Sequence, residues 1–238
     1  YTCTGSISIY DQVFHCHDRN GHGKQDLQAA MIHSCNPYFI ALSQKLSAAT
    51  LFQTAEKLGY GTEIPLTDSI SADGGILPTL QDLKISAEKA NFCFGQGMLT
   101  ASPLQVARMT CAIANGGTLM KPYLVDSVTN NAGNVIEKTK PEKYKDLMTS
   151  KEAAQLKDYM TAVTDYGTAS VLGGQNYTAA GKTGTAEYSS DKEKDHSWFV
   201  GIANVDNPEL VISVIIEQAD GSAKAVNIAK KVFDAYYQ

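Results

Sequence analysis

The 238-residue chain lacks several features that define whole classes of proteins. Its longest apolar run covers residues 210–216, which is far too short to cross a bilayer. Basic residues are not in excess: 20 Lys and Arg against 25 Asp and Glu give a net charge of −5. Nucleic-acid binding needs a basic stripe, so this charge balance argues against a nucleic-acid partner.

Apolar content, in contrast, is ample. Hydrophobic residues make up 43% of the chain, and 238 residues are enough to bury a substantial core. Disordered chains are poorer in apolar residues and carry more net charge. The composition therefore predicts a soluble, globular domain that acts as an enzyme or binds a ligand.

Cysteine is scarce, with five residues unevenly placed. Cys3 and Cys16 could form a disulfide across a hairpin in an extracytoplasmic protein, or remain two reduced thiols. His15, His17 and His22 lie near them in sequence, but no C-x₂-C or H-x₃-H pair is present. The spacing therefore predicts no metal site. The other cysteines are predicted to be packing residues: Cys35, Cys93 and Cys111.

Helix signals begin at Asp26, and the first helix cannot continue past Asn36 because the residue before a proline is disfavoured in helices. Asn36 is predicted to cap a second helix that opens with Pro37. Residues 59–97 are predicted to be irregular, since glycine, proline and polar residues dominate them. The sequences at 102–105 and 149–152 both predict capping boxes that open further helices.

Apolar spacing predicts which faces of two helices are buried. For the helix after residue 102, the predicted face is Leu104, Ala107, Cys111 and Ala114. For a final helix over 222–237, it is Ala225, Ile228, Ala229, Val232 and Tyr236.

The last third of the chain predicts three successive strands, over 178–188, 197–205 and 210–218. A hairpin is predicted around residues 130–133. Antiparallel strands covered by helices and preceded by a helical region indicate an α+β fold. We expect one domain over 1–238, with a mainly helical part at 1–120 and a sheet-and-helix part at 121–238.

The first of those strands carries Gly-Lys-Thr-Gly-Thr-Ala at 181–186. Lys182 offers a cation beside a cleft, while Thr183 and Thr185 offer hydroxyl donors to a substrate carboxylate. Gly184 leaves the strand bare, so that a peptide could approach and pair with the backbone. The alternative is a turn with a solvated lysine.

A second motif, Ser34-x-Asn36, carries little information alone but lies upstream of a G-Q-G loop at 95–97 and of K-T-G-T. With these motifs the chain resembles the transpeptidase domain of penicillin-binding proteins, most closely the class B, monofunctional kind. The resemblance covers essentially the whole chain. It implies the fold shared by these proteins and serine β-lactamases.

The resemblance also implies roles. Ser34 would relay a proton to or from the leaving amine, and Asn36 would bind the acyl side chain and hold the catalytic lysine. Lys182 would make the electrostatic potential of the cleft more positive, while Thr183 and Thr185 would bind the carboxylate of a peptidoglycan stem peptide or a β-lactam. The Thr185 N–H would form half of the oxyanion hole. No cofactor or metal is implied.

The nucleophile of this family, the serine of S-x-x-K, does not precede Ser34. Two segments have that spacing, 86–89 and 189–192. The first lies after S-x-N, and the second lies in a charged turn where the lysine would stay protonated. We therefore expect the chain to be the C-terminal portion of a longer protein, inactive alone. Its membrane anchor, outside these residues, would place it on the extracytoplasmic face of a bacterial membrane, beside other cell-wall synthesis proteins.

Two alternatives remain at this point. The same fold could serve a β-lactam sensor or a β-lactamase, although no base for deacylation is identifiable in the sequence. A non-catalytic module that binds a cell-wall partner is the other alternative.

Overall fold

The computed structural model describes residues 1–187, 195–219 and 224–238. Its centre is a three-stranded antiparallel sheet, in the order β11 (Ala179–Glu187), β12 (Asp195–Ala203) and β13 (Leu210–Ala219). The three predicted strands are thereby confirmed. Within the described ranges, β11 and β13 form the two edges of this sheet.

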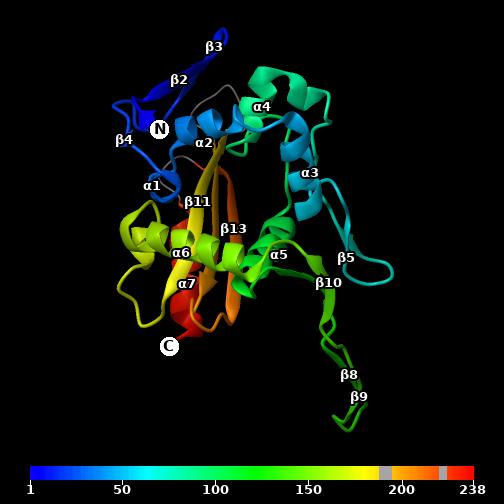
Figure 1. Cartoon of the computed structure of the whole chain (residues 1–238). Helices are drawn as coiled ribbons and strands as arrows, with labels where there is room; N and C mark the ends of the chain where they lie inside the picture. Colours follow the sequence, from blue (N-terminus) through cyan, green and yellow to red (C-terminus); the bar gives the residue numbers. More distant parts are fainter. Residues whose placement is uncertain (188–194, 220–223) are drawn as a thin grey trace.

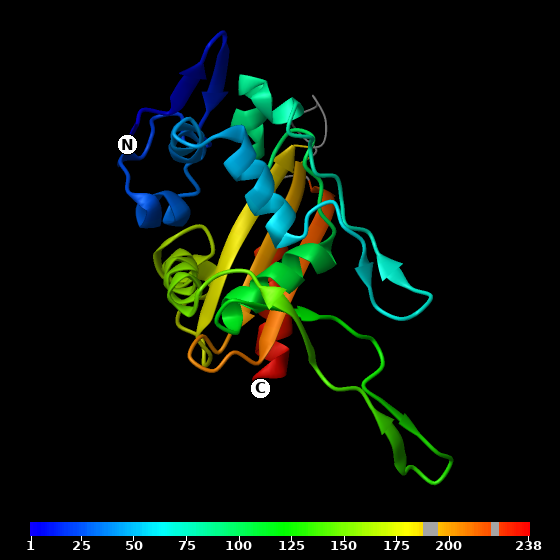
Figure 2. The same cartoon turned by 45° about the vertical axis from the view of Figure 1, so that its right-hand side comes forward.

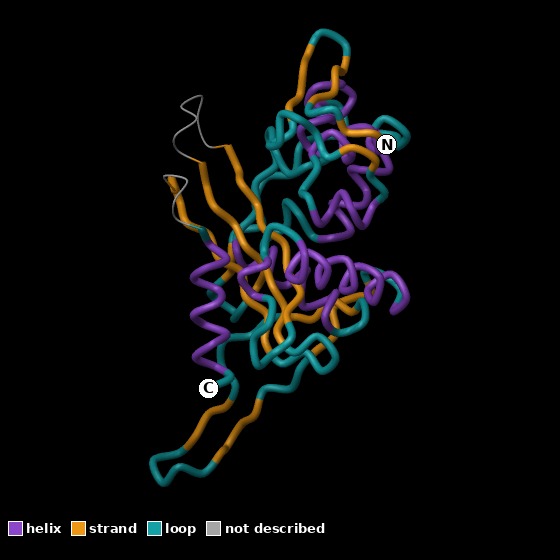
Figure 3. Tube along the Cα trace, turned by 90° about the vertical axis from the view of Figure 1, so that its left-hand side faces the viewer, coloured by secondary structure: helices purple, strands orange, loops and turns teal. Residues whose placement is uncertain are grey.

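Helices cover both faces of the sheet and make an α+β fold (Figures 1 and 3). On one face lie α5 (Pro103–Ala114) and α6 (Ser150–Tyr166), and on the other lies α7 (Ala225–Tyr236). Phe199 of β12 is fully buried against Phe233 of α7. A Cβ at Gly201 would lie 2.6 Å from the Phe199 ring, so the absence of a side chain there makes room for it.

A helical region lies beyond one end of the sheet (Figure 2). Its helices are α1 (Leu27–Ile32), α2 (Asn36–Ser43), α3 (Ala48–Leu58) and α4 (Ser86–Phe92), with the 3-10 turn η1 (Asp82–Lys84). Short antiparallel pairs flank it: β1 (Thr2–Cys3) with β4 (Gly23–Lys24), β2 (Ser6–Ile9) with β3 (Gln12–His15), and β5 (Ile64–Pro65) with β6 (Ser71–Ala72).

The predicted hairpin around 130–133 is confirmed. It joins β8 (Ser127–Thr129) to β9 (Val135–Lys138) and extends away from the sheet (Figure 1). At its base β7 (Thr118–Lys121) pairs with β10 (Glu142–Asp146), while η2 (Ser170–Leu172) follows α6. None of the helices in the described ranges is long and apolar enough to cross a membrane.

Two predictions about helix limits are wrong. Asn36 does not cap α2 but is its first residue, because the extended backbone of Cys35 puts the cap position one residue earlier. Residues 59–97 are not wholly irregular, since α4 occupies 86–92. The start of the last helix at 222 lies outside the described residues, and α7 is described from Ala225.

Two predicted helix faces are only partly correct. The buried side of α5 includes Gln105 and Thr110, and Cys111 is exposed. Thr110 Oγ1 donates to the Val106 carbonyl and Gln105 Nε2 donates to the Leu58 carbonyl, whereas the buried Gln105 Oε1 has no hydrogen-bond partner among the described residues. In α7 the buried residues are Ala225, Val226, Ala229 and Phe233, whereas Ile228, Val232 and Tyr236 are exposed.

The capping box at the start of α6 gives a test of how local sequence stabilises the sheet's covering layer. The Thr149 hydroxyl accepts the Glu152 N–H, and the Glu152 carboxylate accepts the Thr149 N–H. We expect Thr149→Ala to lower the free energy of unfolding by about 1 kcal/mol, measured by urea denaturation. Thr149→Ser, which keeps the hydroxyl, is the control, and equal stability of both variants would contradict the expectation.

Candidate active site

Ser34 lies in the turn between α1 and α2, in a backbone conformation that is uncommon for its residue type. Its φ is 52°, in the left-handed region. The turn is held by the Cys35 N–H, which donates to the Ala30 carbonyl at 2.9 Å. A strained non-glycine residue held by its surroundings is typical of functional sites.

Lys182 reaches this turn from the central sheet. Lys182 lies in β11, where it is paired with Val200 of β12. Its Nζ donates to Ser34 Oγ at 2.8 Å and to the Thr183 carbonyl at 2.9 Å. Burial lowers the pKa of the Lys182 amine to about 8. The structure thus brings together two predicted site residues that are 148 positions apart, and it gives the amine a pKa suited to exchanging protons near neutral pH.

The rest of the K-T-G-T motif continues along the sheet edge. Successive side chains of a strand point to opposite faces, so Lys182 and Thr183 project to different sides of β11. Thr185 is exposed, and Gly184 leaves open the space in which a Cβ would lie 3.2 Å from the Trp198 Cβ. An edge strand with an open face and two hydroxyls can pair with an extended peptide.

Two residues that we did not predict also contact this motif. The Thr168 and Thr183 hydroxyl oxygens lie 2.6 Å apart, and Gln96 Nε2 donates to the Thr185 carbonyl at 3.1 Å. The G-Q-G loop signalled Gln96, although without a role. No local pattern signalled Thr168, because its contact depends on the chain returning after α6.

Asn36 begins α2, two residues after Ser34, and is half-buried. Its side chain makes no hydrogen bond with any residue in the described ranges, and its contact with the catalytic lysine of an S-x-x-K segment stays a prediction. In the segment 86–89, Lys89 Nζ donates to the Leu46 carbonyl. The second S-x-x-K segment, 189–192, lies outside the described residues.

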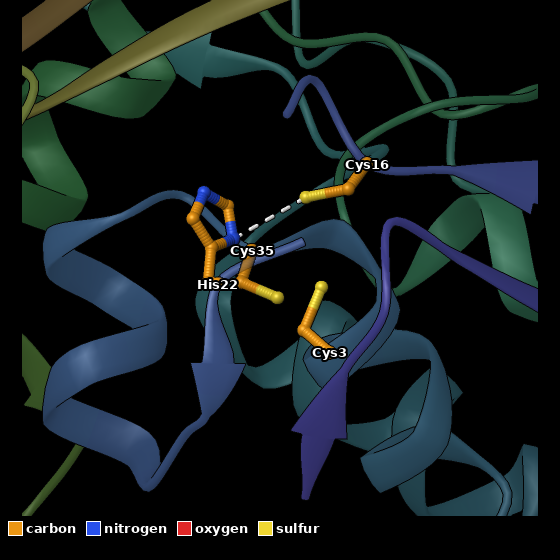
Figure 4. Close-up of side chains that lie close together, drawn as sticks. All are labelled: Cys3, Cys16, His22 and Cys35. Carbon is orange, nitrogen blue, oxygen red and sulfur yellow. Dashed lines mark hydrogen bonds between the residues drawn. The ribbon is translucent and has the colours of Figure 1, made fainter. Parts of the chain in front are cut away.

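The structure matches the second alternative predicted for Cys3 and Cys16, two reduced thiols. Cys3 and Cys16 are free thiols, so the predicted disulfide is not formed in the structure. They lie with His22 and Cys35 in one cluster, whose four sulfur and nitrogen atoms are all within 4.8 Å of one another (Figure 4). Sequence spacing did not reveal this set, since Cys35 approaches the others only through the fold. These four side chains are of the types that hold a metal ion.

Comparison with known proteins identifies the family of this chain. The family model described as the penicillin binding protein transpeptidase domain matches residues 1–236. The chain belongs to this family. It is 32% identical to the peptidoglycan D,D-transpeptidase MrdA of Haemophilus influenzae, and 31% identical to the stage V sporulation protein D of Bacillus subtilis. Each match covers 92% of this chain but only 37% and 34% of those relatives, so the chain spans about a third of their length.

Solved structures of penicillin-binding proteins show the same fold. Pseudomonas aeruginosa PBP2 in complex with WCK 5153 matches with a TM-score of 0.84 and 27% identity, over 99% of this chain and 55% of that one. The ceftriaxone acyl-enzyme complex of penicillin-binding protein A from M. tuberculosis matches with a TM-score of 0.88 and 25% identity, over 100% and 55%. The relatives over most of the chain are class B proteins.

The lowered pKa of Lys182 makes a pH-dependent prediction. The unfolded chain holds this proton up to about pH 10.4, whereas the folded chain releases it near pH 8. Between these values the unfolded state binds more protons, so the free energy of unfolding should rise with pH. We expect this rise in urea denaturation series between pH 8 and 10, and its absence in Lys182→Met. A Lys182 side-chain NMR resonance that titrates at the ordinary lysine value would contradict the prediction.

Proposed function

We propose that this chain carries part of the active site of a peptidoglycan D,D-transpeptidase, which cross-links stem peptides through a serine acyl-enzyme and binds β-lactams. The observation that carries the proposal is the hydrogen bond from Lys182 Nζ to Ser34 Oγ. This hydrogen bond joins the K-T-G-T motif to the S-x-N motif, and proton transfer to the leaving amine needs a path between them. Membership of the transpeptidase family supports the same reaction class.

Each residue has a role in this proposal. Lys182 and Ser34 pass a proton to the leaving amine, since the amine can exist in both protonation states near pH 8. Thr183 and Thr185 bind the substrate carboxylate, and the Thr185 N–H stabilises the oxyanion that develops at the attacked carbonyl. Asn36 contacts the acyl portion of the substrate. The exposed edge of β11 pairs with the peptide backbone.

We further propose that the nucleophilic serine lies outside these 238 residues. The relatives are about three times as long as the matched region, which leaves room for an S-x-x-K segment elsewhere in such a protein. The candidate at 86–89 fits poorly, because Lys89 donates to the Leu46 carbonyl instead of approaching Lys182. The acyl-enzyme would then form only when the missing serine is supplied.

The proposed setting is the extracytoplasmic face of a bacterial membrane, where peptidoglycan is cross-linked. A solved relative with a TM-score of 0.83 belongs to a peptidoglycan synthase complex that coordinates polymerisation and crosslinking. By analogy, we propose other cell-wall synthesis proteins as partners.

Acylation by a β-lactam tests the proposed position of the nucleophile. We expect intact-mass spectrometry to show no ceftriaxone adduct on this chain, under conditions in which M. tuberculosis penicillin-binding protein A forms its acyl-enzyme. A stoichiometric adduct on a serine of this chain would show that the nucleophile is present. Hydrolytic turnover of ceftriaxone would instead favour the β-lactamase alternative.

Non-covalent binding tests the carboxylate site. Thr168→Val removes the hydroxyl that lies 2.6 Å from Thr183 Oγ1, and a net hydrogen bond of this kind contributes about 0.5–1.5 kcal/mol. We expect ceftriaxone, titrated against the chain by NMR, to bind about two- to tenfold more weakly to the variant. Thr139→Val, in the hairpin that extends from the sheet, is the control. Equal weakening by both variants would rule out a specific contribution from Thr168.

A further inference from the structure

The cysteine cluster is assembled from four separate places in the N-terminal region. Cys3 ends β1, Cys16 follows β3, and His22 precedes β4. Cys35 is the N-terminal cap residue of α2. The three sulfurs belong to residues that are at most 2% exposed, and their side chains converge on one point with the His22 ring beside them (Figure 4).

The donor set and its spacing fit one particular ion. Three thiolates and one imidazole form a common tetrahedral ligand set for zinc. With Zn–S of about 2.3 Å and Zn–N of about 2.0 Å, tetrahedral ligand atoms lie about 3.5–3.8 Å apart. Cys16 Sγ lies 3.4 Å from His22 Nδ1, and all four atoms lie within 4.8 Å of one another. Small side-chain rotations would suffice to close the set around an ion.

Tight turns make the convergence possible. Gly5 has a φ of +93°, and a Cβ there would lie 2.0 Å from the Arg19 carbonyl oxygen. Gly21 has a φ of +80°, and its Cβ would lie 2.3 Å from the Cys3 carbonyl oxygen. The two segments therefore approach each other more closely than any residue with a side chain would allow.

The N-terminal region around the cysteine cluster has only a small hydrophobic core to stabilise it. Its buried hydrophobic cluster consists of Cys3, Cys16, Ala30 and Cys35, with Tyr38 and Phe39 packed against it. The β2–β3 hairpin beside it exposes Tyr10 and Val13. A core this small needs an additional crosslink, and one disulfide would leave the third thiol of the cluster unpaired.

We propose that Cys3, Cys16, His22 and Cys35 bind one zinc ion, which fastens residues 1–24 to the turn that carries Ser34. Cys35 lies between Ser34 and Asn36 in sequence, so the ion fixes the backbone of the S-x-N motif without touching substrate. The four residues are ligands, and their contribution to the site is positioning. The zinc assignment is independent of the proposed transpeptidase function.

Metal content is the first test. We expect the chain, expressed with zinc and freed of loose metal by gel filtration, to retain about one zinc per chain in elemental analysis. Cobalt(II) in its place should give the absorption spectrum of a tetrahedral thiolate site. Absence of metal, iron or copper in place of zinc, or a Cys3–Cys16 disulfide in peptide mass spectrometry would overturn the proposal.

Matched substitutions locate the site. Cys35→Ser should reduce zinc retention at least tenfold, whereas Cys93→Ser and Cys111→Ser, which change cysteines outside the cluster, should retain it. If Cys35→Ser does not fold, the cobalt spectrum of the unaltered chain still decides the ligand set. Equal zinc retention by all three variants would overturn the assignment.

Hydrogen exchange tests the positioning role. Zinc removal by a chelator should speed amide exchange at residues 1–24 and 33–36 and leave β11, β12 and β13 protected. Re-addition of zinc should restore the slow exchange. Unchanged exchange at 33–36 after complete zinc removal would show that the ion does not hold the Ser34 turn.

Discussion

The hydrogen bond between Lys182 and Ser34 constrains the whole molecule, because it requires two distant parts of the chain to meet within 2.8 Å. One partner is on a sheet strand and the other is in a strained turn between two helices. A lysine that is buried enough to lose part of its affinity for a proton must be held there by its surroundings. The packing around β11 and the anchoring of the Ser34 turn are the two requirements that follow.

The sheet meets the first requirement. Phe199 fills the space that Gly201 leaves on the α7 side, which lets α7 lie close to the sheet. On the other side, Ala180 and Ile202 pack against α5 and α6 in a second core. Because helices pack on both faces of the sheet, the position of β11 is fixed, and Lys182 projects from a rigid strand. The anchoring of the Ser34 turn depends on the small N-terminal region, whose buried cluster contains cysteines in place of the large apolar residues of an ordinary core.

Local patterns predicted the parts of this fold that depend on local chemistry. The three strands, the hairpin and the α6 capping box were predicted correctly, because alternation, turn residues and capping side chains act within a few positions. The buried face of α5 was not, because Gln105 finds its partner on Leu58, 47 residues away. The grouping of Cys35 with Cys3 and Cys16, and the contact of Thr168 with Thr183, were missed for the same reason. Their neighbours are set by the tertiary fold, and neither residue carries a local signal.

The alternation of side chains along β11 has a consequence for how the site can change. Lys182 and Thr183 are adjacent in sequence, but the pleat directs them to opposite sides of one strand. In the proposed function, the strand would therefore separate the proton-transfer residues on one side from the carboxylate-binding hydroxyls on the other. If the proposed roles hold, substitutions on the Thr183 side would change ligand preference while the Lys182 amine and its neighbour Ser34 stay as they are, so specificity and reactivity would be separable traits in this domain.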